Sequence, residues 1–361
     1  MADPGLLLPP GAVLLHVGPY KTGTTALQAS FEQHRDELRE HGVLYPGTRR
    51  RHARPVFALL GHALPGMPDV PEQEWDDLAD EVRRARDARV VLSSEDFASL
   101  APDQAARAVA DLGADRVHVL MVARNLSGLL PSAWQERVKS VNETKGYHEF
   151  LAEVLAEQPE GASAAVFWRH HSLAALIRLW TDVLPPQRMT VVVADDSDRA
   201  QLRRVCERLL GLPEHVLTEA PAGNPSLSWN RAELYRALNR TAADRHWDAQ
   251  RYRRLVYRGL LAGLVATEPA PDESPIPSLP AWAVRRVAEL GEQRVSELAD
   301  SGVRVVGEVS RLLAPATDDV SGEDHPPTSV PIEAAVHGLE ALVEALRRER
   351  SHRDARPRRL R

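Results

Sequence analysis

The segment from Gly18 to Thr25 is the part of this chain most suited to hold an anion. It reads Gly-Pro-Tyr-Lys-Thr-Gly-Thr-Thr and separates a short apolar run from a helical pattern. Backbone N–H groups at the start of a helix lack partners within the helix, and the helix dipole adds partial positive charge there. The glycines let the backbone curl around an anion, and lysine and threonine side chains add charge and donors. The residues expected to bind a phosphate or sulfate are Gly18, Lys21, Thr22, Gly23, Thr24 and Thr25.

This loop departs from the standard loop of nucleotide triphosphatases. That loop has a lysine directly after its second glycine, whereas here Thr24 occupies this position and Lys21 precedes Gly23. A kinase would also need an acidic residue after a later strand to hold magnesium, which Glu95 or Asp96 could supply. The loop alone is therefore compatible with three alternatives. These are a P-loop small-molecule kinase using ATP and magnesium, a nucleotide-binding module without catalysis, and an ordinary strand-to-helix turn.

Short apolar runs alternate with helical patterns around this loop, which favours a P-loop-type α/β fold with a parallel sheet and helices on both of its faces. Residues 224–300 carry helical patterns and almost no strand signal, which predicts a mostly helical C-terminal segment. Within it, the proline-rich residues 268–280 are expected to form a loop. The expected strands are 12–17, 89–94, 117–123, 189–194 and, more weakly, 303–306. The expected helices are 24–41, 74–86, 102–112, 126–141, 170–183 and 199–210.

Composition excludes several kinds of site. The net charge of −6 argues against nucleic acid as a partner and requires any phosphate site to be locally basic. The single cysteine, Cys206, cannot form an internal disulfide or a multi-cysteine zinc site, and we expect it to be a small buried side chain. The start of the chain has no signal-peptide pattern and no run is long enough to span a membrane, so we expect a cytoplasmic protein.

The chain changes character after Pro315. We expect residues 11–315 to form the α/β domain, 316–331 a flexible linker, and 332–361 an amphipathic helix with an arginine-rich tail. A lone helix of this length is marginal in water, so it needs a surface to pack on. Self-association or docking on the main domain is favoured over an anionic membrane, because the helix also carries acidic residues. Its apolar face comprises Ile332, Ala335, Val336, Leu339, Leu342, Val343 and Leu346.

A second candidate anion ligand follows the run 117–123. Arg124 comes directly after this run, where ligands bind in open α/β sheets, and a guanidinium can grip a phosphate with two parallel hydrogen bonds. Ser132 follows eight residues later. The segment from His16 to Gln28 resembles the 5′-phosphosulfate loop of the sulfotransferases that use 3′-phosphoadenosine 5′-phosphosulfate. The likeness is to the bacterial and Golgi carbohydrate branches, since the cytosolic branch has tryptophan where this chain has Ala26.

The resemblance implies a donor and a reaction. Sulfotransferases bind the 3′-phosphate of the donor through an arginine just past a strand and a serine eight residues later, which Arg124 and Ser132 match. It implies transfer of a sulfuryl group to a hydroxyl of a carbohydrate, glycolipid or small-molecule acceptor, without a metal. Lys21 would stabilise charge on the oxygen that bridges sulfur and phosphorus. The arginine–serine pair separates this interpretation from the kinase, because ATP has no 3′-phosphate.

Glu95 is the predicted catalytic base. It ends the run 89–94, so it should emerge at the same sheet edge as the loop, and its position resembles that of the base in the carbohydrate sulfotransferases. Asp96 is the rival and could instead cap the next helix. We expect His16 to be buried beneath the loop, and His52, in a basic run, to face an acidic acceptor or solvent.

Three residues after Ser132 have open roles. Trp134 could stack on adenine or belong to the core. Arg137 and Lys139 could bind the 3′-phosphate or form a solvated face. The acceptor pocket should come from variable loops and helices, with residues 46–71, 141–169 and 221–239 as candidate segments.

Overall fold

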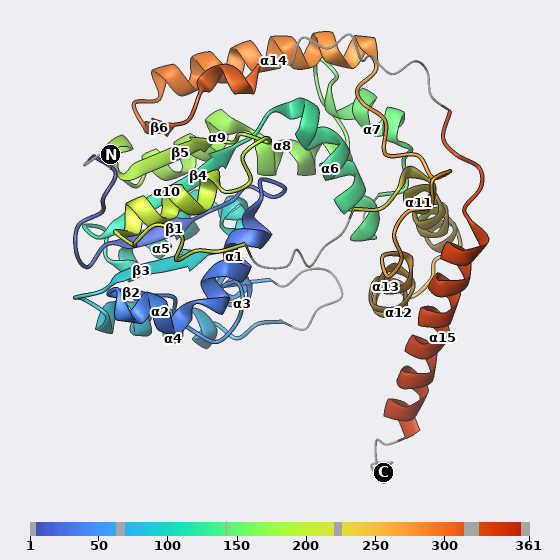
Figure 1. Cartoon of the computed structure of the whole chain (residues 1–361), viewed down its shortest axis with the longest axis horizontal. Coiled ribbons are helices and arrows are strands. Elements are labelled where there is room, and N and C mark those ends of the chain that lie inside the picture. Colours follow the sequence, from blue (N-terminus) through green and yellow to red (C-terminus); the bar gives the residue numbers. More distant parts are fainter. Residues whose placement is uncertain (1–4, 63–68, 142, 220–225, 314–324, 355–361) are drawn as a thin grey trace.

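A single sheet of six parallel strands organises the chain in the computed structural model (Figure 1). The strand order is β2-β3-β1-β4-β5-β6, so β1 lies between β3 and β4. The predicted fold class is therefore confirmed. The strands are β1 Val13–His16, β2 Val43–Leu44, β3 Arg89–Ser93, β4 Val117–Ala123, β5 Met189–Val193 and β6 Arg304–Val306. The structure describes residues 5–62, 69–141, 143–219, 226–313 and 325–354.

Both faces of the sheet are covered because the central strands are apolar on both sides. Val13 and Leu15 of β1 belong to one core, and Leu14 between them belongs to the other. The first core packs against α3 Ala53–Leu60, α4 Gln73–Arg84, α5 Pro102–Leu112 and α9 Leu173–Thr181. The second packs against α1 Thr24–Gln33, α2 Arg35–Glu40 and α10 Gln201–Leu210, which carries the buried Cys206.

Most of the expected strands and helices are found within a few residues of their predicted bounds. Strand β2 was missed, since its two residues are too few to produce a pattern. The expected helix 24–41 is divided at His34, which has a non-helical backbone conformation. The expected helix 170–183 is likewise divided at Ser172, whose hydroxyl caps α9 by accepting from the N–H of Ala175.

The remaining helices form a third core at one side of the sheet, as expected for the mostly helical segment. Its largest buried side chains include Trp134 and Tyr235. The proline-rich loop 268–280 is tied to this layer by a buried ion pair, in which Arg231 donates to Glu273 over 2.6 Å. The helices are α6 Leu126–Lys139, α7 Tyr147–Val154, α8 Ala162–His171, α11 Trp229–Asp244, α12 Ala249–Leu255, the π-helical turn η3 Val256–Leu260, α13 Leu261–Leu264 and α14 Ala281–Asp300.

The last helix, α15 Ile332–Asp354, runs along the outside of η3 and α13 (Figure 1). It is longer than the apolar pattern that predicted it. Most of the expected linker, residues 316–324, and the end of the tail, 355–361, lie outside the described residues. Within the described ranges, every helix is too short or too polar to cross a bilayer.

Candidate anion-binding and catalytic site

The anion loop leaves the carboxyl end of β1 and leads into α1, as predicted. Three of its residues have a left-handed backbone: Gly18 at φ 88°, Lys21 at φ 66° and Gly23 at φ 84°. A Cβ atom at Gly18 would lie 3.1 Å from the Cα of Glu95, so this position requires glycine for space as well as for conformation. Glu95 begins the short helix η1 Glu95–Ser99, which follows β3. The close approach at Gly18 therefore places the loop in direct contact with the predicted base.

The three threonines of the loop have different environments. The hydroxyl of Thr22 donates to the carbonyl of Pro19 over 2.7 Å and so closes the turn. The hydroxyl of Thr24 donates to the carboxylate of Glu95. Only Thr25 is exposed, in the first turn of α1. Thr22 and Thr24 therefore offer an anion their backbone N–H groups, and Thr25 can add its hydroxyl.

Lys21 is held between two groups from the β4–α6 segment. Its Nζ lies 2.8 Å from the carboxylate of Glu136 on α6, and its carbonyl accepts a hydrogen bond of 3.0 Å from Arg124. The structure thus brings together the loop lysine and the candidate 3′-phosphate arginine, which are far apart in sequence. The partner Glu136 was not predicted, although it lies one helical turn after Ser132 and so on the same face of α6.

Arg124 follows β4 and forms a two-pronged pair with Asp196, which follows β5. Nε and Nη2 of the guanidinium donate to the two carboxylate oxygens at 2.9 and 3.1 Å. The side chain of Asp196 is 56% exposed, so this pair can exchange with a competing anion. Ser132 is half-buried on α6. It lies one helical turn after Gly128, which faces the guanidinium of Arg124, and one helical turn before Glu136.

Glu95 is buried, and its carboxylate is surrounded by Thr24, Gln28 and Arg51. Besides Thr24, Gln28 donates to it over 3.2 Å, and Nη1 of Arg51 lies 3.4 Å away. Burial alone would raise the pKa of this carboxyl, but the hydrogen bond from Thr24 and the positive charge of Arg51 outweigh it and lower the pKa. Glu95 is therefore an ionised carboxylate at neutral pH.

Asp96 lies beside Glu95 in a different environment. It accepts hydrogen bonds from the hydroxyls of Tyr20 and Ser94, and Arg51 is 3.7 Å away. Burial raises the pKa of Asp96 despite the opposing effect of Arg51. The prediction that Asp96 could cap the following helix is wrong, because Ser94 caps η1 by accepting from the N–H of Asp96.

The histidines near the loop are structural. His16 is buried as expected, with Nδ1 2.8 Å from the hydroxyl of Ser93. The expectation that His52 faces an acceptor or solvent is wrong, because its ring is buried. Its Nδ1 accepts from the N–H of Ser93 at 3.0 Å, and its Nε2 donates to the carbonyl of Pro46 at 3.0 Å. Desolvation lowers the pKa of both His16 and His52 to about 4, so both rings are neutral.

Trp134, Arg137 and Lys139, whose roles the sequence left open, are held within the protein. Trp134 is fully buried, and its indole N–H donates to the carbonyl of Lys145 over 3.1 Å, so it is not free to stack on adenine. Arg137 forms an ion pair of 2.9 Å with Glu143, which is itself buried. Lys139 is 1% exposed, and burial lowers its pKa to about 8. Arg137 and Lys139 therefore do not form a solvated face.

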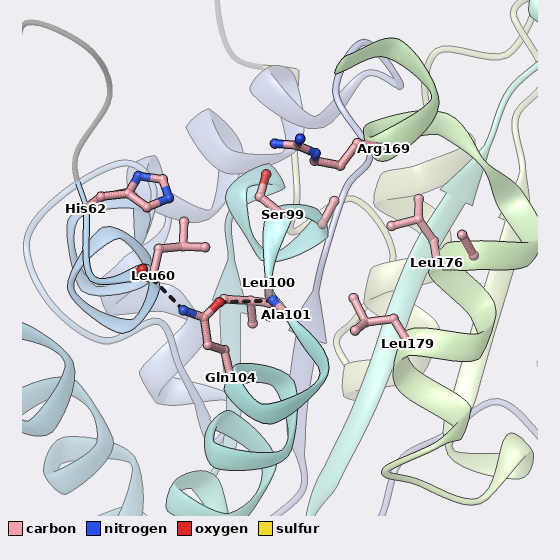
Figure 2. A pocket seen from close by; sticks show the side chains of 11 residues that line it. Leu60, His62, Ser99, Leu100, Ala101, Gln104, Arg169, Leu176 and Leu179 are labelled. Carbon is pink, nitrogen blue, oxygen red and sulfur yellow. Dashed lines mark hydrogen bonds between the residues drawn. The ribbon is translucent and has the colours of Figure 1, made fainter. Parts of the chain in front are cut away.

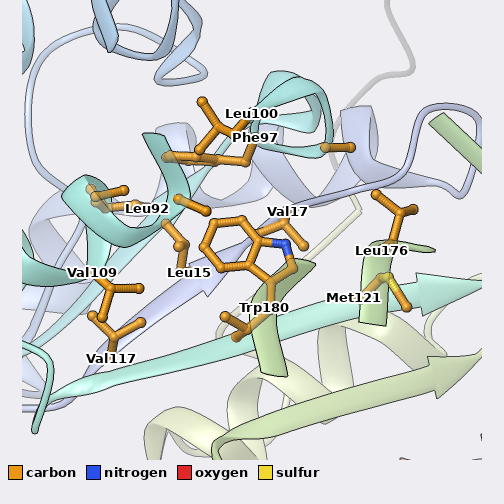
Figure 3. Packing of buried hydrophobic residues seen from close by; sticks show 14 of the residues in the cluster. Leu15, Val17, Leu92, Phe97, Leu100, Val109, Val117, Met121, Leu176 and Trp180 are labelled. Atoms are coloured by element: carbon orange, nitrogen blue, oxygen red, sulfur yellow. The ribbon is translucent and has the colours of Figure 1, made fainter. Parts of the chain in front are cut away.

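A cavity of about 560 Å³ opens beyond η1 (Figure 2). His62, Ser99, Gln104 and Arg169 are polar residues of its lining, and the hydroxyl of Ser99 is 3.0 Å from Nε2 of His170. The ring of His170 in turn meets the ring of Tyr20, with centroids 5.1 Å apart, so the cavity adjoins the anion loop. Its wall continues into the core around Trp180, to which Leu100 and Leu176 also contribute (Figures 2 and 3). The remaining lining residues are Leu60, Ala98, Ala101, Ala175 and Leu179.

Comparisons with known proteins give one distant likeness. No protein-family model matches the chain, and no curated protein matches it significantly. Among solved structures, a sulfotransferase from Alicyclobacillus acidocaldarius is 22% identical, over 68% of this chain and 100% of that one, with a TM-score of 0.37. Among the described residues, no cluster of His, Cys, Asp or Glu side chains has the arrangement of a metal site.

The buried histidines predict acid sensitivity. Because His52 has a folded-state pKa of about 4, below its ordinary value of 6.5, the unfolded chain binds more protons between these pH values. The free energy of unfolding should therefore fall as the pH drops from 6.5 toward 4. His52→Gln should make this fall shallower by up to about 1.4 kcal/mol per pH unit, measured by urea unfolding. The matched variant of the exposed His246, His246→Gln, should keep the wild-type slope, and an unchanged slope in His52→Gln would contradict the assignment.

Proposed function

We propose that the chain is a sulfotransferase that moves a sulfuryl group from 3′-phosphoadenosine 5′-phosphosulfate to a hydroxyl of its acceptor. The observation that carries the proposal is the hydrogen bond from Arg124 to the carbonyl of Lys21. It joins the two motifs that resemble the 5′-phosphosulfate and 3′-phosphate sites of such enzymes. The loop also adjoins the buried Glu95 at Gly18, and this carboxylate could receive the acceptor's proton.

The donor would bind by displacing the carboxylates that pair with Lys21 and Arg124. Its 5′-phosphosulfate would lie on the N–H groups at the start of α1, with Lys21 beside the bridging oxygen. Its 3′-phosphate would take the place of Asp196 on Arg124, near Ser132. Glu136 and Asp196 are 29% and 56% exposed, so releasing their ion pairs costs little compared with binding two multiply charged groups.

Transfer would proceed by displacement at sulfur. The acceptor oxygen forms a bond to sulfur, the bond from sulfur to the bridging oxygen breaks, and 3′-phosphoadenosine 5′-phosphate leaves. Glu95 would take the proton of the acceptor hydroxyl. Positioning and charge stabilisation would do most of the work, with Lys21 and the start of α1 facing the leaving oxygen.

Asp96 is the second candidate for the base. Burial raises the pKa of Asp96 above its ordinary value, which strengthens it as a base, whereas the pKa of Glu95 is lowered. We favour Glu95 because it touches the loop at Gly18 and at Thr24, where α1 begins, whereas the loop residue that donates to Asp96 is Tyr20.

The kinase alternative receives less support. Magnesium would need one of the two carboxylates after β3, and both already lie within 4 Å of the guanidinium of Arg51. ATP would also leave Arg124 without a 3′-phosphate to bind.

Donor binding tests the proposal first. Arg124→Ala should weaken binding of 3′-phosphoadenosine 5′-phosphate by about 1.5–3 kcal/mol, or roughly 10- to 150-fold, and leave binding of 5′-AMP unchanged. Isothermal titration calorimetry would measure both. Arg49→Ala, which removes an exposed arginine of the basic run, is the control and should bind as the wild type does. Equal affinity of the wild type for the two nucleotides would contradict the proposal.

The base is tested by two isosteric variants. Glu95→Gln should bind the donor product normally and turn over about 10²- to 10⁴-fold more slowly, measured with labelled donor and an acceptor found by screening. Asp96→Asn is the matched control and should retain more activity. Circular dichroism would check folding, since both side chains are buried. The reverse order of activities would assign the proton transfer to Asp96.

The cavity beyond η1 is the proposed acceptor site. Ala175 lines it and is exposed, so Ala175→Trp can fill space there without disturbing the core. The substitution should raise the acceptor KM while leaving the affinity for 3′-phosphoadenosine 5′-phosphate unchanged. Ala165→Trp adds the same bulk at an exposed position of α8 outside the cavity lining and should have no effect. An unchanged acceptor KM in Ala175→Trp would place the acceptor elsewhere.

A further inference from the structure

Helix α15 docks on the rest of the chain through its small side chains. Ala334 and Ala345 are buried, and so is Gly338. The two backbones approach closely: a Cβ atom at Gly263 would lie 2.8 Å from the Cα of Gly338, and one at Gly259 would lie 2.9 Å from the Cβ of Ala345. Larger residues on this face would therefore separate α15 from η3 and α13.

The large apolar side chains of α15 point the other way, to the surface. Ile332 is 83% exposed, Val336 45%, Leu339 58% and Val343 46%. With the half-buried Leu346, they are spaced by four, three, four and three residues. This average period of 3.5 residues is that of a coiled-coil seam. The apolar face predicted from the sequence thus lies largely outside the intramolecular contact and still lacks a cover among the described residues.

Charges along α15 indicate what covers this seam. Glu333 and Glu340 lie in its first part, and exposed arginines, Arg347, Arg348 and Arg350, lie in its last part. The last part also carries Glu344, which pairs with Arg347 over 3.0 Å, and Glu349, which pairs with Arg251 over 3.1 Å, so arginines outnumber acids there by one. Parallel pairing with an identical helix would bring like charges together. Antiparallel pairing about a point near Leu339 would bring Glu333 of each helix to Arg347 of the other, and Glu340 would lie beside the axis. An anionic membrane fits less well, since the two glutamates would approach it as well.

We propose that a second copy of this chain covers the seam, with the two α15 helices packed antiparallel about a twofold axis near Leu339. In this arrangement Ile332 meets Leu346, Val336 meets Val343, and Leu339 meets itself. The contact is self-complementary, as a twofold interface requires. The seam is about 21 Å long, so the dimer should dissociate on dilution. The proposal stands independently of the reaction that the chain catalyses.

Sedimentation velocity of the full-length chain from about 1 to about 100 μM tests the proposal. The wild type should convert from monomer to dimer with rising concentration. Leu339→Glu should stay monomeric, because it sets two carboxylates against each other at the axis, while its exposed position leaves the monomer folded by circular dichroism. Ser351→Glu, with the same charge at an exposed position off the seam, should dimerise as the wild type does.

Charge exchange tests the orientation. Glu333→Arg should weaken the dimer, and adding Arg347→Glu should restore it, since these two positions face each other only in an antiparallel pair. A double variant as weak as the single one would overturn the orientation. A wild type that is monomeric at all these concentrations would overturn the dimer. If that monomer bound phosphatidylserine-containing vesicles and Leu339→Glu did not, the seam would be a membrane surface instead.

Discussion

The position of β1 between β3 and β4 is the constraint on which the site depends. In a parallel sheet, the segments that follow the strands all begin at the same edge. The segments after these three neighbouring strands must therefore share one small volume. Gly18 lies against Glu95 for this reason, and Arg124 reaches the carbonyl of Lys21 for the same reason. The strand order places the backbone of each segment close to the site. The side chains of these segments therefore do not have to extend far to meet one another.

Charge within the site is balanced pair by pair. Lys21 pairs with Glu136 and Arg124 with Asp196, both at partly exposed positions, while Arg51 faces two buried carboxylates. The two kinds of pair behave differently toward an incoming anion. The exposed carboxylates can move into solvent and leave their cations free, whereas Glu95 and Asp96 have no such route and keep Arg51 in place.

The sequence was sufficient to predict the parts of the fold that depend on local pattern. The strands around the loop, the glycine turn and the Arg124–Ser132 spacing are all readable within short windows. The counterions Glu136 and Asp196 and the role of Arg51 were not readable, because they arise only when distant segments meet. His52 shows the same limit, since its basic neighbours predicted a surface position while tertiary packing buries its ring between Ser93 and Pro46. In α15 the periodicity predicted the helix and its apolar face, but which face docks was decided by the close approach of Gly263 to Gly338.

In the proposed site, the hydrogen bond from Thr24 to Glu95 would couple anion binding by the loop to the proton affinity of Glu95. Thr24 opens the helix whose N–H groups face the expected anion, so the anion and the carboxylate are close neighbours of like charge. A nearby negative charge makes a carboxyl hold its proton more tightly. Such linkage is reciprocal: an anion that strengthens proton binding is itself bound more strongly by the protonated form. If the loop binds an anion as we propose, that anion would raise the pKa of Glu95 from its lowered value and make the carboxylate a better proton acceptor.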